Sequence, residues 1–280
     1  MTSPLVEALR DPIVLTPNRI SRFYRGGRLM DAFRGLPAGV DDDRPEDWLG
    51  SATATWQPPG ATAHTIRISR VELDGRRLPL DEVLRAEPRA LTGGIQPQGA
   101  APSLGMLVKL IDAAERLPVH CHPTRPQAAR LLGSPFGKTE AWIVLGTRDV
   151  GPPPVVWAGF ELFRTDAPGD LRQHAGPSAD HDGLRLTPLL GPAADPYFRA
   201  LRVEITGLEV ALPIVPSFAV GVAIGGRGSL RGRTRSLPLA RGTTFALAAA
   251  AIPSARVSSD GAFEAILCLP AEPTVAGALS

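Results

Sequence analysis

The amino-acid sequence predicts a mainly β protein with a few short helices, and three observations support this fold class. First, the chain has 280 residues, of which 44% are hydrophobic, enough to bury the core of one large β domain or of two smaller ones. Second, 29 glycines and 29 prolines interrupt the chain often, which favours many short strands joined by turns. Third, short apolar or alternating runs lie between these residues, as is typical of a sandwich or a barrel.

These runs place the expected elements along the chain. Helices are predicted at residues 44–49 and 80–85, where acidic residues precede or begin the segment. A third helix is predicted at 126–132, which starts with a proline and stops before Gly133. Residues 166–196 are polar, rich in Gly, Pro and Asp, and without periodicity, so they predict a linker. Strands are predicted at residues 64–73, 117–121, 141–145, 155–158, 200–212, 218–224, 243–249 and 262–269.

Composition argues against several classes of function. The formal net charge is +2 and no basic run carries interleaved aromatic residues, so we expect no nucleic-acid partner. The first nine residues lack the features of a signal peptide, and the longest apolar stretch, 245–252, is too short for a membrane span. We therefore expect no membrane partner. Cys121 and Cys268 are too few for a disulfide framework, which predicts a cytoplasmic protein.

A pair of histidines is the main candidate for chemistry. On a strand, His120 and His122 point to one side and Cys121 to the other, so we expect the thiol to pack in the core. Two imidazoles on one face are natural ligands of a divalent transition metal. An isolated pair of this kind more often marks a solvated strand face. Here Glu140 follows within a Gly-Lys-Thr-Glu segment and supplies a carboxylate, which favours the metal site.

Lysine is rare in this chain. Lys109 and Lys138 are its only lysines among 30 Lys and Arg residues. We therefore expect that these two positions require the compact ammonium group of lysine, which the planar guanidinium group of arginine cannot replace. Both lie close in sequence to the histidine pair, which makes them candidates for the same site.

Three segments together resemble the signature of the type I mannose-6-phosphate isomerases. They are residues 45–48 (PEDW), 107–123 (LVKLIDAAERLPVHCHP) and 137–142 (GKTEAW). The resemblance is clear over residues 18–160 and weaker over 196–270.

This resemblance implies a cupin-type fold made of jelly-roll barrels, with two cupin-like units. The first unit, residues 1–165, is expected to be the metal-binding catalytic domain. The expected linker at 166–196 leads to a C-terminal cupin-like β domain at 197–280.

The resemblance also implies a reaction and a site. The family interconverts mannose 6-phosphate and fructose 6-phosphate by zinc-assisted proton transfer, which implies a Zn²⁺ cofactor, a sugar-phosphate substrate and a monomer or homodimer. His120, His122 and Glu140 match metal-ligand positions, with His120 standing where glutamine is usual. Lys138 matches the lysine close to the metal and is the expected catalytic residue. Lys109 matches the lysine that lines the substrate pocket.

The chain departs from the family pattern in one large respect. The block Pro-Ala-Gly-x-x-His-Ala, which supplies the last histidine ligand, is absent, as is the following segment with a catalytic arginine. Three ligands with an open position still suit zinc, and His174 and His181 are candidates for a replacement ligand. Two alternatives stay open. One is a non-catalytic or degenerate cupin that binds a sugar phosphate or a metal. The other is a cupin enzyme of another kind, such as an iron-dependent oxygenase, because two histidines and a carboxylate also suit Fe(II).

Overall fold

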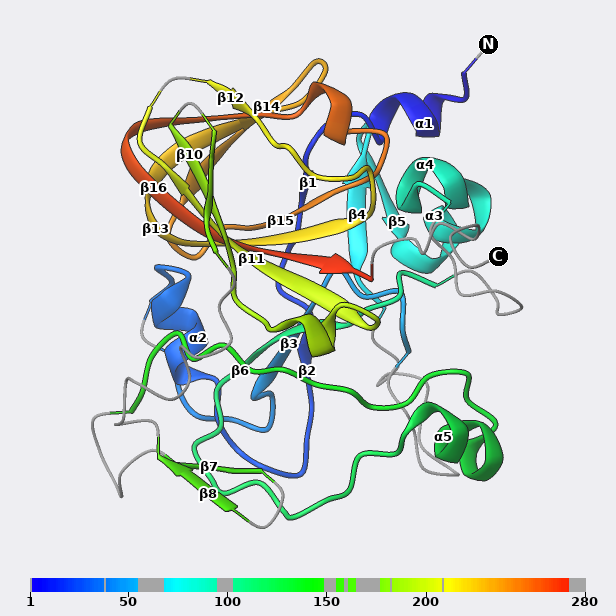
Figure 1. The fold of residues 1–280 in the computed structure, drawn as a ribbon, viewed down its shortest axis with the longest axis vertical. Helices are drawn as coiled ribbons and strands as arrows, with labels where there is room; N and C mark the ends of the chain where they lie inside the picture. The colour runs from blue at the N-terminus through cyan, green and yellow to red at the C-terminus, as the bar shows by residue number, and fades with distance from the viewer. Residues whose placement is uncertain are drawn as a thin grey trace.

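The structure is a computed structural model. It describes residues 2–37, 39–54, 68–94, 103–148, 177–181, 183–207 and 209–271, and the backbone alone of residues 155–158 and 161–164. The largest part of the described chain is one antiparallel sheet (Figure 1). Its nine described strands follow the order β1 (Ile13–Val14), β15 (Thr244–Leu247), β13 (Ala219–Arg231), β16 (Arg256–Pro270), β11 (Phe198–Ile205), β10 (Leu184–Pro188) and β9 (Ala179–His181), with β12 (Val210–Ala211) on β16 and β14 (Ser236–Ala240) on β13.

Smaller sheets and short helices surround this sheet. The sheet that matters for the site has the order β2 (Arg19–Ile20), β3 (Glu46–Leu49) and β6 (Val108–Ile111). Two hairpins pair β4 (Arg70–Leu73) with β5 (Arg76–Pro79), and β7 (Val155–Ala158) with β8 (Glu161–Arg164). The helices are α1 (Pro4–Ala8), α2 (Arg28–Phe33), α3 (Leu80–Ala86), α4 (Pro88–Thr92) and α5 (Arg125–Leu132), with 3-10 turns η3 (Pro192–Ala194) and η4 (Ile252–Ser254). None of the helices in the described ranges is long and apolar enough to cross a membrane.

The long strands β13 and β16 curve strongly, as Figure 1 shows. Their pairing has two register shifts, between Ala223 and Gly225 and between Gly226 and Gly228. Gly226 has a φ of +71°, and a Cβ at this position would lie 1.8 Å from the carbonyl oxygen of Ala262. Only glycine fits such a bulge, and bulges bend and twist the strands that carry them.

The central strands of the large sheet are buried on both faces, because their alternate residues enter two different hydrophobic cores. In β13, Val220 and Val222 join one core, while Ala219 and Ala223 join the other. The first core also contains residues of α1, β1, β3, β4 and α3, so the N-terminal half of the chain packs on this face. The predicted units 1–165 and 197–280 therefore share a core, and their boundaries stay a prediction.

Several predicted elements agree with the structure. Helices 80–85 and 126–132 are α3 and α5. The predicted strands 155–158, 218–224, 243–249 and 262–269 overlap β7, β13, β15 and β16, respectively. The predicted strand 200–212 overlaps β11 and contains β12. Of the predicted strand 64–73, residues 70–73 form β4, while His64 lies outside the described residues.

Three predicted elements are wrong. Residues 44–49 contain strand β3 instead of a helix, because β2 and β6 pair with it on both sides and outweigh the acidic residues that favour a helix start. Residues 117–121 and 141–145 are not strands, since no described strand pairs with either segment. In addition, the predicted linker 166–196 includes β9 and β10 of the large sheet; residues 166–176 lie outside the described residues.

A buried ion pair joins the small sheet to the large one. Asp47 in β3 is fully buried and accepts hydrogen bonds from the Arg34 guanidinium and, at 2.7 Å, from the Asn18 backbone N–H. Arg34 also donates to the hydroxyl of Thr244 in β15, at 3.1 Å. A buried carboxylate needs such partners, so this contact fixes the position of β3 on the core.

Replacing Asp47 with alanine is expected to lower the free energy of unfolding by about 3–5 kcal/mol, because it leaves the Arg34 charge buried without its carboxylate. Urea denaturation measures the change. The matched control is Asp180→Ala, which removes an exposed carboxylate paired with Arg185 and should have a much smaller effect. Equal losses in the two variants would contradict the role given to Asp47.

Candidate active site

Three side chains predicted from the sequence surround the ammonium group of a fourth, Lys138. The Nζ atom of Lys138 lies 2.9 Å from Nε2 of His122, 3.4 Å from Nε2 of His120 and 3.0 Å from a carboxylate oxygen of Glu140. The rings of His120 and His122 stack with centroids 4.9 Å apart, and His122 Nε2 lies 3.6 Å from the second oxygen of Glu140. We call these four residues the lysine cluster.

Local sequence signals bring the two halves of the lysine cluster together. Helix α5 lies between them and is closed by a capping box of Thr124 and Gln127 at its start and by Gly133 at its end. After the helix, the chain returns so closely that a Cβ on Gly137 would lie 2.7 Å from the carbonyl oxygen of Pro123. The same carbonyl accepts the backbone N–H of Lys138 at 2.9 Å. The short excursion through α5 thus sets Lys138 beside the histidines.

The segment that carries Glu140 is held at its far end by Arg148. The guanidinium of Arg148 donates to both Asp41 and Asp112, and Asp112 in turn accepts the backbone N–H groups of Gly27 and Leu29 at the start of α2. Arg148 thus anchors the end of segment 138–148 to α2 and to residue 41.

One expectation about this segment is wrong. Cys121 is exposed, although the sequence predicts that it packs in the core. Residues 119–122 form no regular strand, so the alternation on which the prediction rests is absent. The expected juxtaposition of the His120 and His122 rings is present without a regular strand.

A second group of side chains surrounds Glu46, a residue that the sequence analysis did not single out. Its carboxylate is only 8% exposed and accepts hydrogen bonds from Arg22 at 2.8 and 3.1 Å, from the Tyr24 hydroxyl at 2.8 Å and from the Trp48 indole N–H at 2.7 Å. Lys109 Nζ lies 3.3 Å from the same carboxylate. The positive groups of Arg22 and Lys109 both lie on the Trp48 ring, 5.1 and 4.8 Å from its centroid. We call these five residues the Glu46 network.

The two groups of residues influence each other electrostatically. Burial acts to raise the pKa of Glu140, but the hydrogen bond and charge of Lys138 outweigh it, and His122 and Lys109 add to the lowering. Glu140 is therefore ionised well into the acidic range. Burial lowers the pKa of His122, and the charge of Lys138 lowers it further, so this ring is neutral at neutral pH.

In the Glu46 network, the pKa values of Glu46 and Tyr24 are shifted by their surroundings. Burial would raise the pKa of Glu46, but hydrogen bonds from Arg22 and Trp48 and the charge of Lys109 lower it to about 2. Burial and the nearby Glu46 charge raise the pKa of Tyr24, so its hydroxyl stays protonated and acts as a donor.

The donors of the lysine cluster suit zinc by type but not by their present arrangement. Two imidazole nitrogens and a carboxylate are ligands that zinc takes. Within the described ranges, however, no three His, Cys, Asp or Glu side chains form a group that could hold a metal ion. The three donors all contact the Lys138 ammonium instead. Of the proposed replacement ligands, His174 lies outside the described residues, and His181 pairs with Leu184 at the end of the large sheet.

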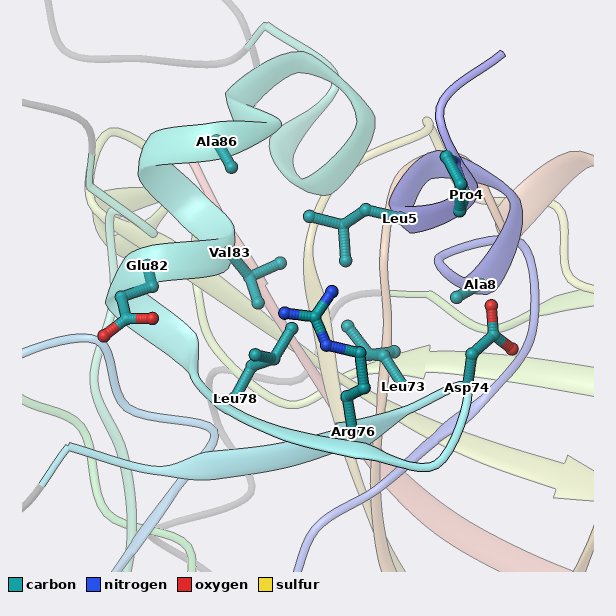
Figure 2. A pocket seen from close by; sticks show the side chains of 10 residues that line it. All are labelled: Pro4, Leu5, Ala8, Leu73, Asp74, Arg76, Leu78, Glu82, Val83 and Ala86. Carbon is teal, nitrogen blue, oxygen red and sulfur yellow. The ribbon is translucent and has the colours of Figure 1, made fainter.

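A cavity lies elsewhere in the described part of the chain, between α1, the β4–β5 hairpin and α3 (Figure 2). Its volume is about 230 Å³, and its walls are mainly apolar, with Leu5, Leu73, Leu78 and Val83 around the side chain of Arg76. None of the residues predicted for chemistry lines it. It is therefore separate from the lysine cluster and from the Glu46 network.

Comparison of the sequence with protein-family models and with curated proteins finds no match. Solved structures do match. The mannose 6-phosphate isomerase from Bacillus subtilis aligns over 92% of this chain and 99% of its own, with a TM-score of 0.64 and 18% identity. A proposed mannosephosphate isomerase from Archaeoglobus fulgidus aligns over 93% of this chain and 98% of its own, with a TM-score of 0.57 and 17% identity. The likeness confirms the predicted resemblance at the level of the fold: the chain is mainly β, of cupin type, and has the fold of these isomerases.

The stability that Glu46 contributes should depend on pH. Its pKa is about 2 in the folded protein and has an ordinary value of 4.5, so the unfolded chain binds more protons between these values. The contribution, about 3 kcal/mol, is complete above the ordinary value and is lost as the pH falls toward about 2. Urea denaturation of the wild type and of Glu46→Gln, from about pH 6 to about pH 2, measures it. We expect the difference in unfolding free energy between the two proteins to shrink on acidification, and a constant difference would contradict this assignment.

Proposed function

We propose that this protein is a sugar-phosphate isomerase that interconverts mannose 6-phosphate and fructose 6-phosphate at the lysine cluster. One observation carries the proposal. The ammonium of Lys138, two imidazoles and the carboxylate of Glu140 converge within 3.4 Å, at the positions that the isomerase-like motif predicts. The fold shared with isomerases supports it. The roles of these residues are part of the proposal.

The reaction moves one proton between C1 and C2 of the sugar phosphate and passes through an enediolate. It needs a group that takes and returns the proton, and positive charge beside the developing oxyanion. Lys138 is bonded to both Glu140 and His122, so a proton taken by one member is shared among groups that lie about 3 Å apart. The positive charge of Lys138 stabilises the oxyanion. If zinc binds here, His120, His122 and Glu140 would hold it, the metal would supply polarisation of the substrate carbonyl group, and the proton transfer would fall to Lys138 alone.

The phosphate group of the substrate is assigned to Lys109 and Arg22 beside the lysine cluster. Both side chains are partly exposed and lie against Trp48, while Glu46 neutralises only one of their two charges. The Glu46 network therefore keeps a net positive charge, which attracts a phosphate dianion. The charge of Lys109 also lowers the pKa of Glu140, which supports placing both subsites in one site.

A second candidate is binding of a sugar phosphate without turnover. The specific observation in its favour is exposure: the side chains of Lys138, His122 and Glu140 are 43%, 31% and 28% exposed. Water-excluding closure protects an enediolate in an efficient isomerase, and the described residues leave this cluster open. Pro118 also stands where the family often has serine, which removes a hydroxyl group from the pocket.

The direct test is conversion of mannose 6-phosphate to fructose 6-phosphate, measured by a coupled assay with added Zn²⁺. We expect turnover by the wild type and a loss of at least about a hundredfold in kcat for Glu140→Gln and Lys138→Met, because each removes a group that the proposed proton transfer requires. Lys109→Met should mainly raise KM. Asp180→Ala, on the exposed β9–β10 hairpin, is the control that should retain full activity.

Two results would contradict the isomerase. One is unchanged turnover in Lys138→Met. The other is a folded wild type that binds the sugar phosphate in calorimetry and forms no product, which would establish the binding function in its place.

A further inference from the structure

The β4–β5 hairpin carries an arginine on the face that it turns toward the hydrophobic core. The hairpin turn, Asp74-Gly75, has φ values of +48° and +73°, as in the two-residue turns that favour Asp-Gly. This turn sets Leu73 directly opposite Arg76, so the two side chains share one face of the hairpin. Leu73 is only 4% exposed. The strand pattern therefore calls for an apolar residue at position 76, and such departures from the pattern are expected at functional positions.

The guanidinium of Arg76 has no partner of its own in the described part of the chain, where it makes no hydrogen bond and no ion pair. Figure 2 shows it in the middle of the side chains that line the cavity between α1, the β4–β5 hairpin and α3. Two carboxylates line the same cavity. Asp74 is paired with Arg235 at 2.9 Å, and Glu82 is exposed and lies at the edge of the lining residues (Figure 2). Arg76 is thus the free charge at the centre of the cavity.

The walls of the cavity are fixed by contacts between distant segments. The Ser3 hydroxyl at the start of α1 donates to Glu87 at the end of α3, at 2.6 Å. Glu7 in α1 pairs with Arg233 at 2.6 Å, in the turn between β13 and β14. The pair between the hairpin turn and residue 235 ties the third wall to this same turn. The space between the walls is therefore a preformed feature of the fold.

The size and lining of the cavity define the class of molecule that fits it. Leu73 and Val83 belong to the hydrophobic core, so the cavity is apolar at its base. A cavity of about 150 Å³ holds benzene, so one of about 230 Å³ has room for a chain of roughly six to nine non-hydrogen atoms. A guanidinium binds a carboxylate through two parallel hydrogen bonds. An alkyl chain that ends in one carboxylate satisfies both features.

We propose that this cavity binds a small aliphatic monocarboxylate, with the carboxylate on Arg76 and the alkyl chain among the apolar side chains. The ligand supplies the inward-facing arginine with the partner that no described residue provides. The site is separate from the lysine cluster and does not rest on the proposed isomerase function.

The test is a ligand-observed NMR titration of the wild-type protein with hexanoate, compared with hexanol, hexylamine and acetate. Hexanol lacks the charge, hexylamine reverses it and acetate lacks the chain. We expect hexanoate to bind with a Kd below about 1 mM. The other three should bind at least about tenfold more weakly, because each lacks either the carboxylate or the apolar chain.

Three variants locate the site. Arg76→Met keeps an apolar side chain and removes the charge, and we expect it to raise the Kd for hexanoate at least about tenfold. Arg77→Met is the matched control, because this exposed neighbour lies on the opposite face of β5 and does not line the cavity. It should change the Kd at most about twofold. Ala86→Phe places a ring in the cavity from α3 and should abolish binding, while circular dichroism confirms its fold.

Four results would overturn the proposal. The first is no binding of hexanoate by the wild type at about 10 mM, tenfold above the expected Kd. The second is an equal loss in the two arginine variants, which reduces the effect to general charge. The third is equal affinity for hexanoate and hexanol, which leaves Arg76 the role of covering apolar side chains or blunting a sheet edge. The fourth is unchanged binding in folded Ala86→Phe. No sugar phosphate or metal enters these titrations, so they are independent of the isomerase assay.

Discussion

The buried charge of Glu46 is the constraint on which the site depends. A carboxylate with so little exposure is stable in the folded protein only if donors surround it, and it gathers Arg22, Tyr24, Trp48 and Lys109 from three neighbouring segments. These contacts hold two positive side chains against one indole ring. On the opposite side of the same strand, Asp47 is tied to the core through Arg34. Neighbouring residues of β3 therefore have different roles. Asp47 fixes the strand on the core, and Glu46 holds the side chains proposed to bind phosphate.

The lysine cluster depends on a different kind of constraint, which is local in sequence. A capped helix and a close return of the chain at Gly137 bring His120, His122 and Glu140 to one amine without a regular strand. The donors suit zinc by type, and the structure shows the Lys138 ammonium among them.

Sequence reasoning succeeded where signals are local. Helix α5 follows from Pro126 near its start and Gly133 at its end, and the mainly β class follows from the punctuated apolar runs. The cupin-type fold follows from the resemblance of the motif segments to the isomerase family. It failed where distant partners decide, as in β3, whose acidic residues favour a helix until β2 and β6 pair with it. Glu46 was not predicted as a site residue, because no neighbouring residue indicates that its carboxylate is buried. It lies two residues before Trp48, and this spacing alone suggests that the two side chains share one face of a strand. The structure brings His120, His122, Lys138 and Glu140 together, while their chemical roles, the oligomeric state and the cytoplasmic location stay predictions.

The most direct test of the account is hydrogen exchange at the reacting carbons. Fructose 6-phosphate incubated with the wild-type protein and Zn²⁺ in D₂O is followed by proton NMR. The account predicts that a C1 proton signal of fructose 6-phosphate declines while mannose 6-phosphate appears, and that Lys138→Met shows neither change at a comparable rate. A wild-type sample that binds the sugar phosphate, yet shows no loss of the C1 signal and no second sugar phosphate, would contradict the claim that the lysine cluster transfers a proton.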